Sequence, residues 1–233
     1  MLKNELLGTL LGDSYIGANG NKFSFRVDHC PEQLDYLNHI ADIIRKEYNK
    51  HVSVYYRNKR NIHCLYFHNN DFKFYRDRYY PDGKKSITSI LNDITDPVIA
   101  LAYWLMDDGC IHYSTNNKTY LSPRFLLATC AESEQTLKTV IEWFDINFKI
   151  KPYITVQKNH KRKKEWLLLK FTVVDSFKLW QLVRHKIIHL PSMKHKFRIP
   201  EQEFKLEFYK IKYLHESPSS NLEENICRTD KEK

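Results

Sequence analysis

Long apolar runs are missing from this chain. The longest, from Val98 to Met106, ends at Asp107 and Asp108 and is far shorter than the roughly 20 residues that cross a bilayer. The sequence therefore predicts no membrane partner. The amino terminus carries neither a signal peptide nor an Arg-rich transit sequence. We therefore expect an intracellular protein, and the interior of an organelle such as the mitochondrion is one location that fits.

Cysteine, glycine and proline are also sparse. The 5 cysteines are scattered, odd in number and without a CxxC pair, which argues against a disulfide framework and against a structural zinc site. With 6 glycines and 8 prolines among 233 residues, the chain is neither collagen-like nor of low complexity.

Acidic residues are too few to balance the basic ones. Lys and Arg number 37 against 28 Asp and Glu, which gives a formal net charge of +9, while 42% of the residues are hydrophobic. The hydrophobic share predicts a packed globular protein, and the length allows one large domain or two small ones. A globular protein this basic usually has a polyanion as its partner.

The chain repeats one order of elements twice. Each half opens with a short apolar helix ending in Asp, one running through Leu6–Asp13 and the other through Leu101–Asp108. Alternating strands, a second helix, a further strand pair with a polar turn, and a last helix follow in both halves. We therefore predict an α+β fold made of two pseudo-symmetric αββαββα half-domains, each with an antiparallel sheet. The predicted boundaries are 1–95 for the first half and 96–215 for the second, followed by a polar, disordered tail over 216–233.

The two helices that end in Asp indicate a metal site. Both are apolar nearly all round and are therefore expected to be buried, and Gly8 and Gly12 share one face of the first helix, where they would admit a close partner. If the helices pack side by side, Asp13 and Asp108 meet at their carboxyl-terminal ends. Two carboxylates there repel each other and the helix dipoles unless a divalent cation such as Mg²⁺ neutralises them.

The same segments resemble a known family. Leu-Leu-Gly-Thr-Leu-Leu-Gly-Asp-Ser, from Leu6, and Leu-Ala-Tyr-Trp-Leu-Met-Asp-Asp-Gly, from Leu101, resemble the paired motifs of the LAGLIDADG homing endonucleases, of the single-chain type similar to the omega-intron endonuclease. The resemblance extends from the start of the chain to about Pro200. The motifs depart from the family at Ser14, in place of a last Gly, and at Tyr103, in place of a small third residue.

This resemblance implies a set of active-site residues. Asp13 and Asp108 would bind Mg²⁺, with the carbonyl groups of Gly12 and Asp107 as further ligands, whereas the Asp107 side chain is expected to point elsewhere. Mn²⁺ would substitute for Mg²⁺, and Ca²⁺ would support binding without cleavage. Lys85 and Lys196 resemble the family's catalytic lysines, and the neighbouring Lys84 and Lys194 remain open as alternatives.

Basic turns and alternating strands predict a surface for double-stranded DNA. A two-stranded ribbon presents alternate side chains to base edges in the major groove, while turn residues meet phosphates. The expected DNA-binding residues are Arg26, Ser53, Tyr55, Arg57, Lys59, Arg60, Arg124, and the crowded second turn formed by Lys158, His160, Lys161, Arg162, Lys163 and Lys164.

The resemblance implies a monomeric, Mg²⁺-dependent endonuclease of intron mobility. It would cut both strands of a long, non-palindromic DNA site and leave short 3′ overhangs. Two alternatives stay open. One is an RNA maturase that assists splicing and binds intron RNA, and the other is a non-catalytic DNA-binding protein on the same scaffold.

Overall fold

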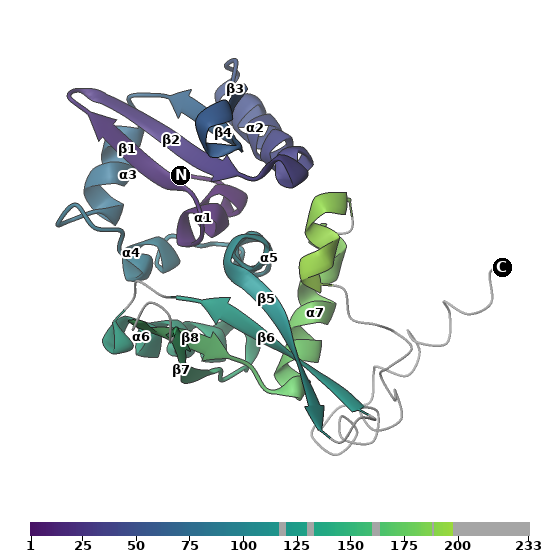
Figure 1. Ribbon diagram of the computed structural model, residues 1–233. Coiled ribbons are helices and arrows are strands. Elements are labelled where there is room, and N and C mark those ends of the chain that lie inside the picture. The colour runs from purple at the N-terminus through teal and green to yellow at the C-terminus, as the bar shows by residue number, and fades with distance from the viewer. Residues whose placement is uncertain (117–119, 130–132, 160–163, 188, 198–233) are drawn as a thin grey trace, which may run out of the picture.

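Two four-stranded antiparallel sheets lie toward opposite ends of the molecule, with two helices between them (Figure 1). The structure is a computed structural model, and it describes residues 1–116, 120–129, 133–159, 164–187 and 189–197. The predicted tail therefore lies outside the described residues. Among those described, no helix is both long and apolar enough to cross a membrane.

The amino-terminal half carries the first sheet, in the strand order β1-β2-β4-β3. Its elements are α1 (Asn4–Leu11), β1 (Tyr15–Asn19), β2 (Lys22–His29), η1 (Pro31–Gln33), α2 (Leu34–Tyr48), β3 (Ser53–Arg57), η2 (Asn58–Arg60), β4 (Ile62–His68), α3 (Phe72–Tyr79) and α4 (Ile87–Leu91).

The carboxyl-terminal half repeats this order, with the second sheet arranged β5-β6-β8-β7. Its elements are α5 (Pro97–Asp108), β5 (Gly109–Asn116), β6 (Tyr120–Ala128), α6 (Glu134–Phe148), β7 (Tyr153–Asn159), β8 (Lys164–Lys170), α7 (Val173–Ile187) and η3 (Pro191–Phe197). The predicted α+β class and the duplicated αββαββα order are confirmed, and the short helices α4 and η3 are additions at the end of each half.

Period-two alternation leaves one face of each sheet without helices. In the first sheet, Phe25 and Val27 on β2 are fully buried under α2 and α3, while Arg26 between them lies on the other face. In the second sheet, Phe125 and Leu127 on β6 are buried, and Arg124 lies on the outer face. Each sheet therefore keeps one face that the helices do not cover, with Arg26 on the first and Arg124 on the second.

Glycine lets α1 and α5 pack at very short range. A Cβ at Gly8 would overlap the carbonyl oxygen of Ala100 and lie 2.8 Å from the Cβ of Tyr103, so only Gly fits against this part of α5. The bulky Tyr103 is tolerated because its partner has no side chain. Its hydroxyl lies 2.6 Å from Nε2 of His39 on α2.

Candidate active site

The acids predicted to bind metal lie at the end of the paired helices. Asp108 is the last residue of α5, whereas Asp13 follows the end of α1 by two residues. Asp13 is exposed and Asp108 is half-buried. The structure brings the two together closely enough for the charge of one to act on the other.

Burial and this proximity together raise the pKa of Asp108 to about 7. Burial is the largest cause, the negative charge of Asp13 is the next, and the positive charges of Lys85 and Lys196 oppose both. Burial and a neighbouring acid both disfavour the charged form of this carboxyl, and a cation bound between the two acids would offset that cost.

Two lysines reach the same site, one from each half. Lys85 follows α3, and its Nζ donates a hydrogen bond to the carbonyl oxygen of Gly12 at 2.7 Å. Lys196 is on η3, and its Nζ donates to the carbonyl oxygen of Asp107. The alternatives Lys84 and Lys194 are exposed, so this geometry favours Lys85 and Lys196.

The helix η3 fixes the position of Lys196 by crossing back to the amino-terminal half. The main-chain N–H of Ser192 donates to Oδ2 of Asp35 on α2 at 3.1 Å, and the side chain of Met193 is fully buried. The second lysine is therefore held against the first half of the molecule, which the sequence does not reveal.

The sequence does not reveal two groups beside the acids, His29 and Tyr36, nor the direction of the Asp107 side chain. His29 on β2 is buried, with Nδ1 at 3.9 Å from Oδ2 of Asp13 and Nε2 at 3.8 Å from Oδ1 of Asp107. Tyr36 on α2 donates its hydroxyl to Oδ1 of Asp107 at 2.9 Å. The side chain of Asp107 points into the interface between the two helices, where it is fully buried. Burial and the charge of Asp13 raise the pKa of Asp107 well above its ordinary value.

These residues fit a divalent cation. The donors are two carboxylates and the carbonyl groups of Gly12 and Asp107, and hard oxygen ligands of this kind suit Mg²⁺ or Mn²⁺. Both carbonyl groups already accept hydrogen bonds from ammonium groups, so both are directed at positive charge. Asp13, His29 and Asp107 also place ligand atoms within 4.8 Å of one another.

The outer face of the first sheet carries several of the predicted DNA-binding residues in register. Arg26 pairs with Tyr15 on β1 and Tyr66 on β4, and Tyr66 pairs with Ser53. The Arg26 guanidinium lies over the Tyr66 ring at 4.7 Å, and Nε donates to the Ser24 hydroxyl at 2.9 Å. The two tyrosines are exposed and were not predicted from the sequence.

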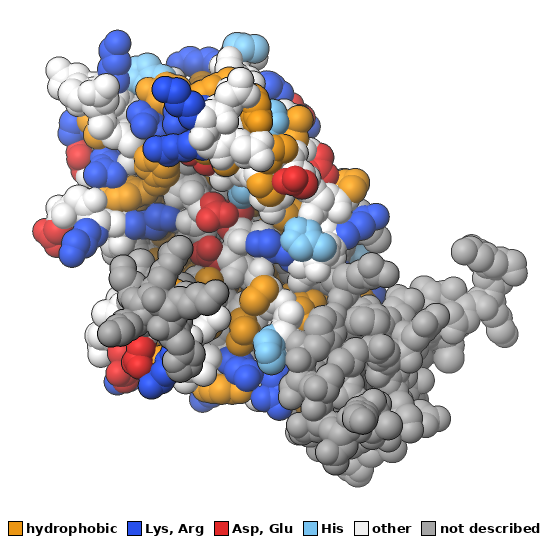
Figure 2. Space-filling view, in the orientation of Figure 1, with side chains coloured by type: hydrophobic (Ala, Val, Ile, Leu, Met, Phe, Trp, Pro, Cys, Tyr) orange, Lys and Arg blue, Asp and Glu red, His pale blue; other side chains and the backbone are white. Residues whose placement is uncertain are grey.

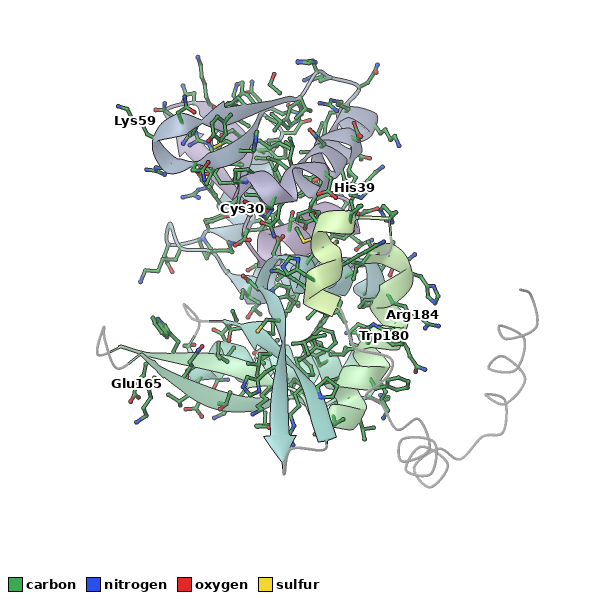
Figure 3. All side chains as sticks on the ribbon, turned by 45° about the vertical axis from the view of Figure 1, so that its right-hand side comes forward. Cys30, His39, Lys59, Glu165, Trp180 and Arg184 are labelled. Carbon is green, nitrogen blue, oxygen red and sulfur yellow. The ribbon has the colours of Figure 1, made fainter. Side chains whose placement is uncertain are left out.

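The strands β3 and β4 and the turn η2 between them form the first two-stranded ribbon, and its basic residues lie toward the turn. Arg57 donates to the Tyr55 hydroxyl at 2.7 Å, and Lys59 and Arg60 follow in the exposed turn η2. Figure 3 shows Lys59 at the end of the first sheet and Glu165 at the end of the second, on the same side of the molecule. Both ribbons therefore extend toward one side.

The second ribbon corrects part of the sequence prediction. Lys158 and Lys164 were expected in a turn, but they lie in strands β7 and β8, because the pairs Lys158–Glu165 and Asn159–Lys164 extend the ladder. Lys158 also forms an exposed ion pair of 2.9 Å with Glu165. Arg124 lies on the outer face, with Nη1 3.5 Å from the Tyr153 hydroxyl. His160, Lys161, Arg162 and Lys163 lie outside the described residues.

Charge is distributed over this side of the molecule in a pattern suited to a nucleic acid. Asp and Glu side chains gather in the middle, between the halves, and Lys and Arg side chains lie on both sides of them (Figure 2). A basic surface on either side of a small acidic centre suits a polyanion whose phosphates approach bound cations.

The fold and site define a duplicated single-chain protein in which one pair of helices brings an acid from each half together, and each half adds a lysine. The family model described as the LAGLIDADG DNA endonuclease family matches residues 4–178, and the chain belongs to this family. The predicted family resemblance is thereby confirmed. A search of curated protein sequences finds no match.

The solved structures to which this chain is similar include homing endonucleases. The homing endonuclease I-WcaI bound to its DNA recognition sequence is 22% identical, with a TM-score of 0.63 over 84% of this chain and 85% of that one. I-DmoI in complex with DNA and Ca is 15% identical, with a TM-score of 0.49 over 77% and 87%. The meganuclease I-AabMI bound to uncleaved DNA is 11% identical, with a TM-score of 0.46 over 92% and 91%.

Proposed function

We propose that this protein is a homing endonuclease that makes a metal-dependent double-strand break in a long, non-palindromic DNA site. The cut leaves short 3′ overhangs and serves intron mobility. Mg²⁺ is the proposed cofactor, Mn²⁺ replaces it, and Ca²⁺ supports DNA binding without cleavage. One chain supplies both halves of the site, so the proposed active form is a monomer.

One observation carries the proposal. Asp13 and Asp108, from opposite halves, lie close enough for one to raise the pKa of the other, and each half adds a lysine beside a main-chain carbonyl group. A scaffold that only bound DNA would gain nothing from burying an acid next to another acid. Metal-dependent phosphodiester hydrolysis, in contrast, can use such a cluster to hold the cation.

Each group has a defined task in this reaction. A bound divalent cation would supply charge stabilisation at the phosphate and a more acidic water. Asp13 and Asp108 hold that cation, with the carbonyl groups of Gly12 and Asp107. Lys85 and Lys196 stabilise negative charge on phosphate oxygens or order the attacking water.

The duplex is proposed to lie across the uncovered faces of both sheets. Arg26 and Tyr55 read base edges from the first sheet and Arg124 from the second, while Lys59 and Arg60 contact phosphates. The two faces differ in sequence, so the two halves of the target site differ as well.

Selection of cleaved sites from a randomised duplex library with Mg²⁺ tests the proposal. The wild-type protein should enrich one asymmetric site, and Asp13→Asn or Asp108→Asn should abolish cutting while leaving Ca²⁺-supported binding of that site largely intact. Full cutting by one of these variants would remove the acid that it replaces from the mechanism. Preferential retention of intron RNA over every duplex in filter binding would favour the maturase.

A further inference from the structure

Asp107 and Asp108 are consecutive acids at the end of α5, but only one faces the site. The Asp107 side chain is 0% exposed, and it lies in the interface between the halves. A buried carboxylate is costly unless its oxygens are hydrogen-bonded, so its partners indicate what it does.

The first partner is the main chain of the other acid. The helix α5 runs through Asp108, so helical hydrogen bonds hold the main chain of that residue. The helix α1 ends at Leu11, and the Gly12 N–H returns to the carbonyl oxygens of Gly8 and Thr9. The N–H of Asp13 lies beyond this helical end, and it donates instead to Oδ2 of Asp107 at 3.1 Å.

The other partners hold Asp107 in place. Its Oδ1 accepts the Tyr36 hydroxyl at 2.9 Å, and the Tyr36 ring lies 5.1 Å from the ring of buried His29. Gly12 provides the space, because a Cβ there would overlap the Cβ of Asp107 and lie 2.8 Å from Oδ2. The carboxylate is therefore fixed on both oxygens and on one side by packing.

We propose that Asp107 is a positioning residue that fixes the main chain of Asp13 through its side chain, and with it the direction of the Asp13 carboxylate. The role rests on the proposed function, in which Asp13 holds a cation. The main chain of each acid is then held in place. The helix α5 holds that of Asp108, and the Asp107 side chain, from the opposite half, holds that of Asp13.

Three variants separate positioning from charge. Asp107→Ala removes both hydrogen bonds. Asp107→Asn removes the ionisable carboxyl but keeps the geometry, since its carbonyl can accept from Asp13 and its NH₂ can donate to the Tyr36 oxygen. Tyr36→Phe removes one support and leaves the carboxylate in place.

The first readout does not depend on activity. Hydrogen exchange of the Asp13 amide, measured in the metal-free protein, should be about tenfold faster or more in Asp107→Ala than in the wild type, and close to wild type in Asp107→Asn. Exchange in Tyr36→Phe should be intermediate. Unchanged exchange in Asp107→Ala would overturn the proposal, and thermal unfolding of each variant verifies that it folds.

The second readout is single-turnover cleavage against Mg²⁺ concentration. Asp107→Ala should cut about 10- to 100-fold more slowly and need more Mg²⁺ for half-maximal rate, since small misplacements of a reactive group have effects of that size. Asp107→Asn should recover most of the loss. Equal losses in the two variants would overturn the proposal, because Asp107 would then act through its ionisable carboxyl and not through the hydrogen bonds that Asn keeps. If the wild type cuts no DNA while amide exchange changes as expected, the proposed function fails and the positioning contact stands.

Discussion

Replacing Asp108 by asparagine should stabilise the metal-free protein at neutral and alkaline pH, at the expense of function. Burial and the charge of Asp13 raise the pKa of Asp108 to about 7, from an ordinary value of 3.8. When the carboxyl ionises in the folded protein, this difference corresponds to roughly 4 kcal/mol of lost stability. Asparagine has a similar shape and carries no charge, so it avoids that loss.

The effect has a defined pH window. The folded protein binds this proton more tightly than the unfolded chain does, so the stability from the protonated carboxyl is fully present below pH 3.8 and is lost as the pH rises through about 7. The unfolding free energy of the wild type should therefore fall across this range relative to that of Asp108→Asn. At acid pH the two proteins should be nearly equal.

Urea unfolding with EDTA, at about pH 5 and about pH 8, measures this difference. Asp108→Asn should gain stability over the wild type mainly at the higher pH. Asp82→Asn, which removes an exposed carboxylate in the turn after α3, is the matched control for loss of one negative charge. Parallel pH dependence of the wild type and Asp108→Asn would refute the reasoning that burial and the charge of Asp13 raise the pKa of Asp108.

Further predictions concern packing, specificity, phosphate contacts and metal. Gly8→Ala should cost more than about 2 kcal/mol of stability, because its methyl group would meet main chain of α5 that cannot move; an unchanged urea midpoint would contradict this. Arg26→Gln should weaken discrimination at one base pair of the selected site by about 1–3 kcal/mol, and an unaltered site preference would exclude Arg26 as a base reader. Replacing Lys59 and Arg60 with serine should reduce the slope of log K for DNA binding against log salt concentration by about 2. An unchanged slope in this variant would mean that η2 does not contact phosphate. Mg²⁺ should raise the melting temperature more at pH 8 than at pH 5, and Asp13→Asn should abolish this gain; equal shifts in wild type and variant would place the ion elsewhere.

The sequence was sufficient for the fold and for the acids because both are local patterns repeated twice. Apolar segments that lead to an Asp, alternating strands and polar turns each occur in both halves, so one half supports the interpretation of the other. The pairing of α1 with α5 followed from Gly8 and Gly12, and the overlap that a Cβ would make there confirms it.

The active-site groups that the sequence did not reveal act across the two halves. His29 and Tyr36 belong to the first half and contact an acid of the second, so no spacing within either motif reveals them. The direction of the Asp107 side chain depends on where α1 ends, which the motif does not indicate. The strand positions of Lys158 and Lys164 depend on a cross-strand ladder that overrides their polar, turn-like composition.

The contact between α1 and α5 is unequal, and this limits how the molecule can be recombined. At matching positions α1 offers Gly8 and Gly12, while α5 offers Tyr103 and Asp107, and each large residue occupies space that a glycine leaves open. Two copies of the carboxyl-terminal half would set tyrosine against tyrosine and acid against acid, and two copies of the amino-terminal half would leave a gap. Neither half of this chain can therefore pair with a second copy of itself. A chimera with another nuclease half must keep a small residue on one helix opposite each large residue on the other.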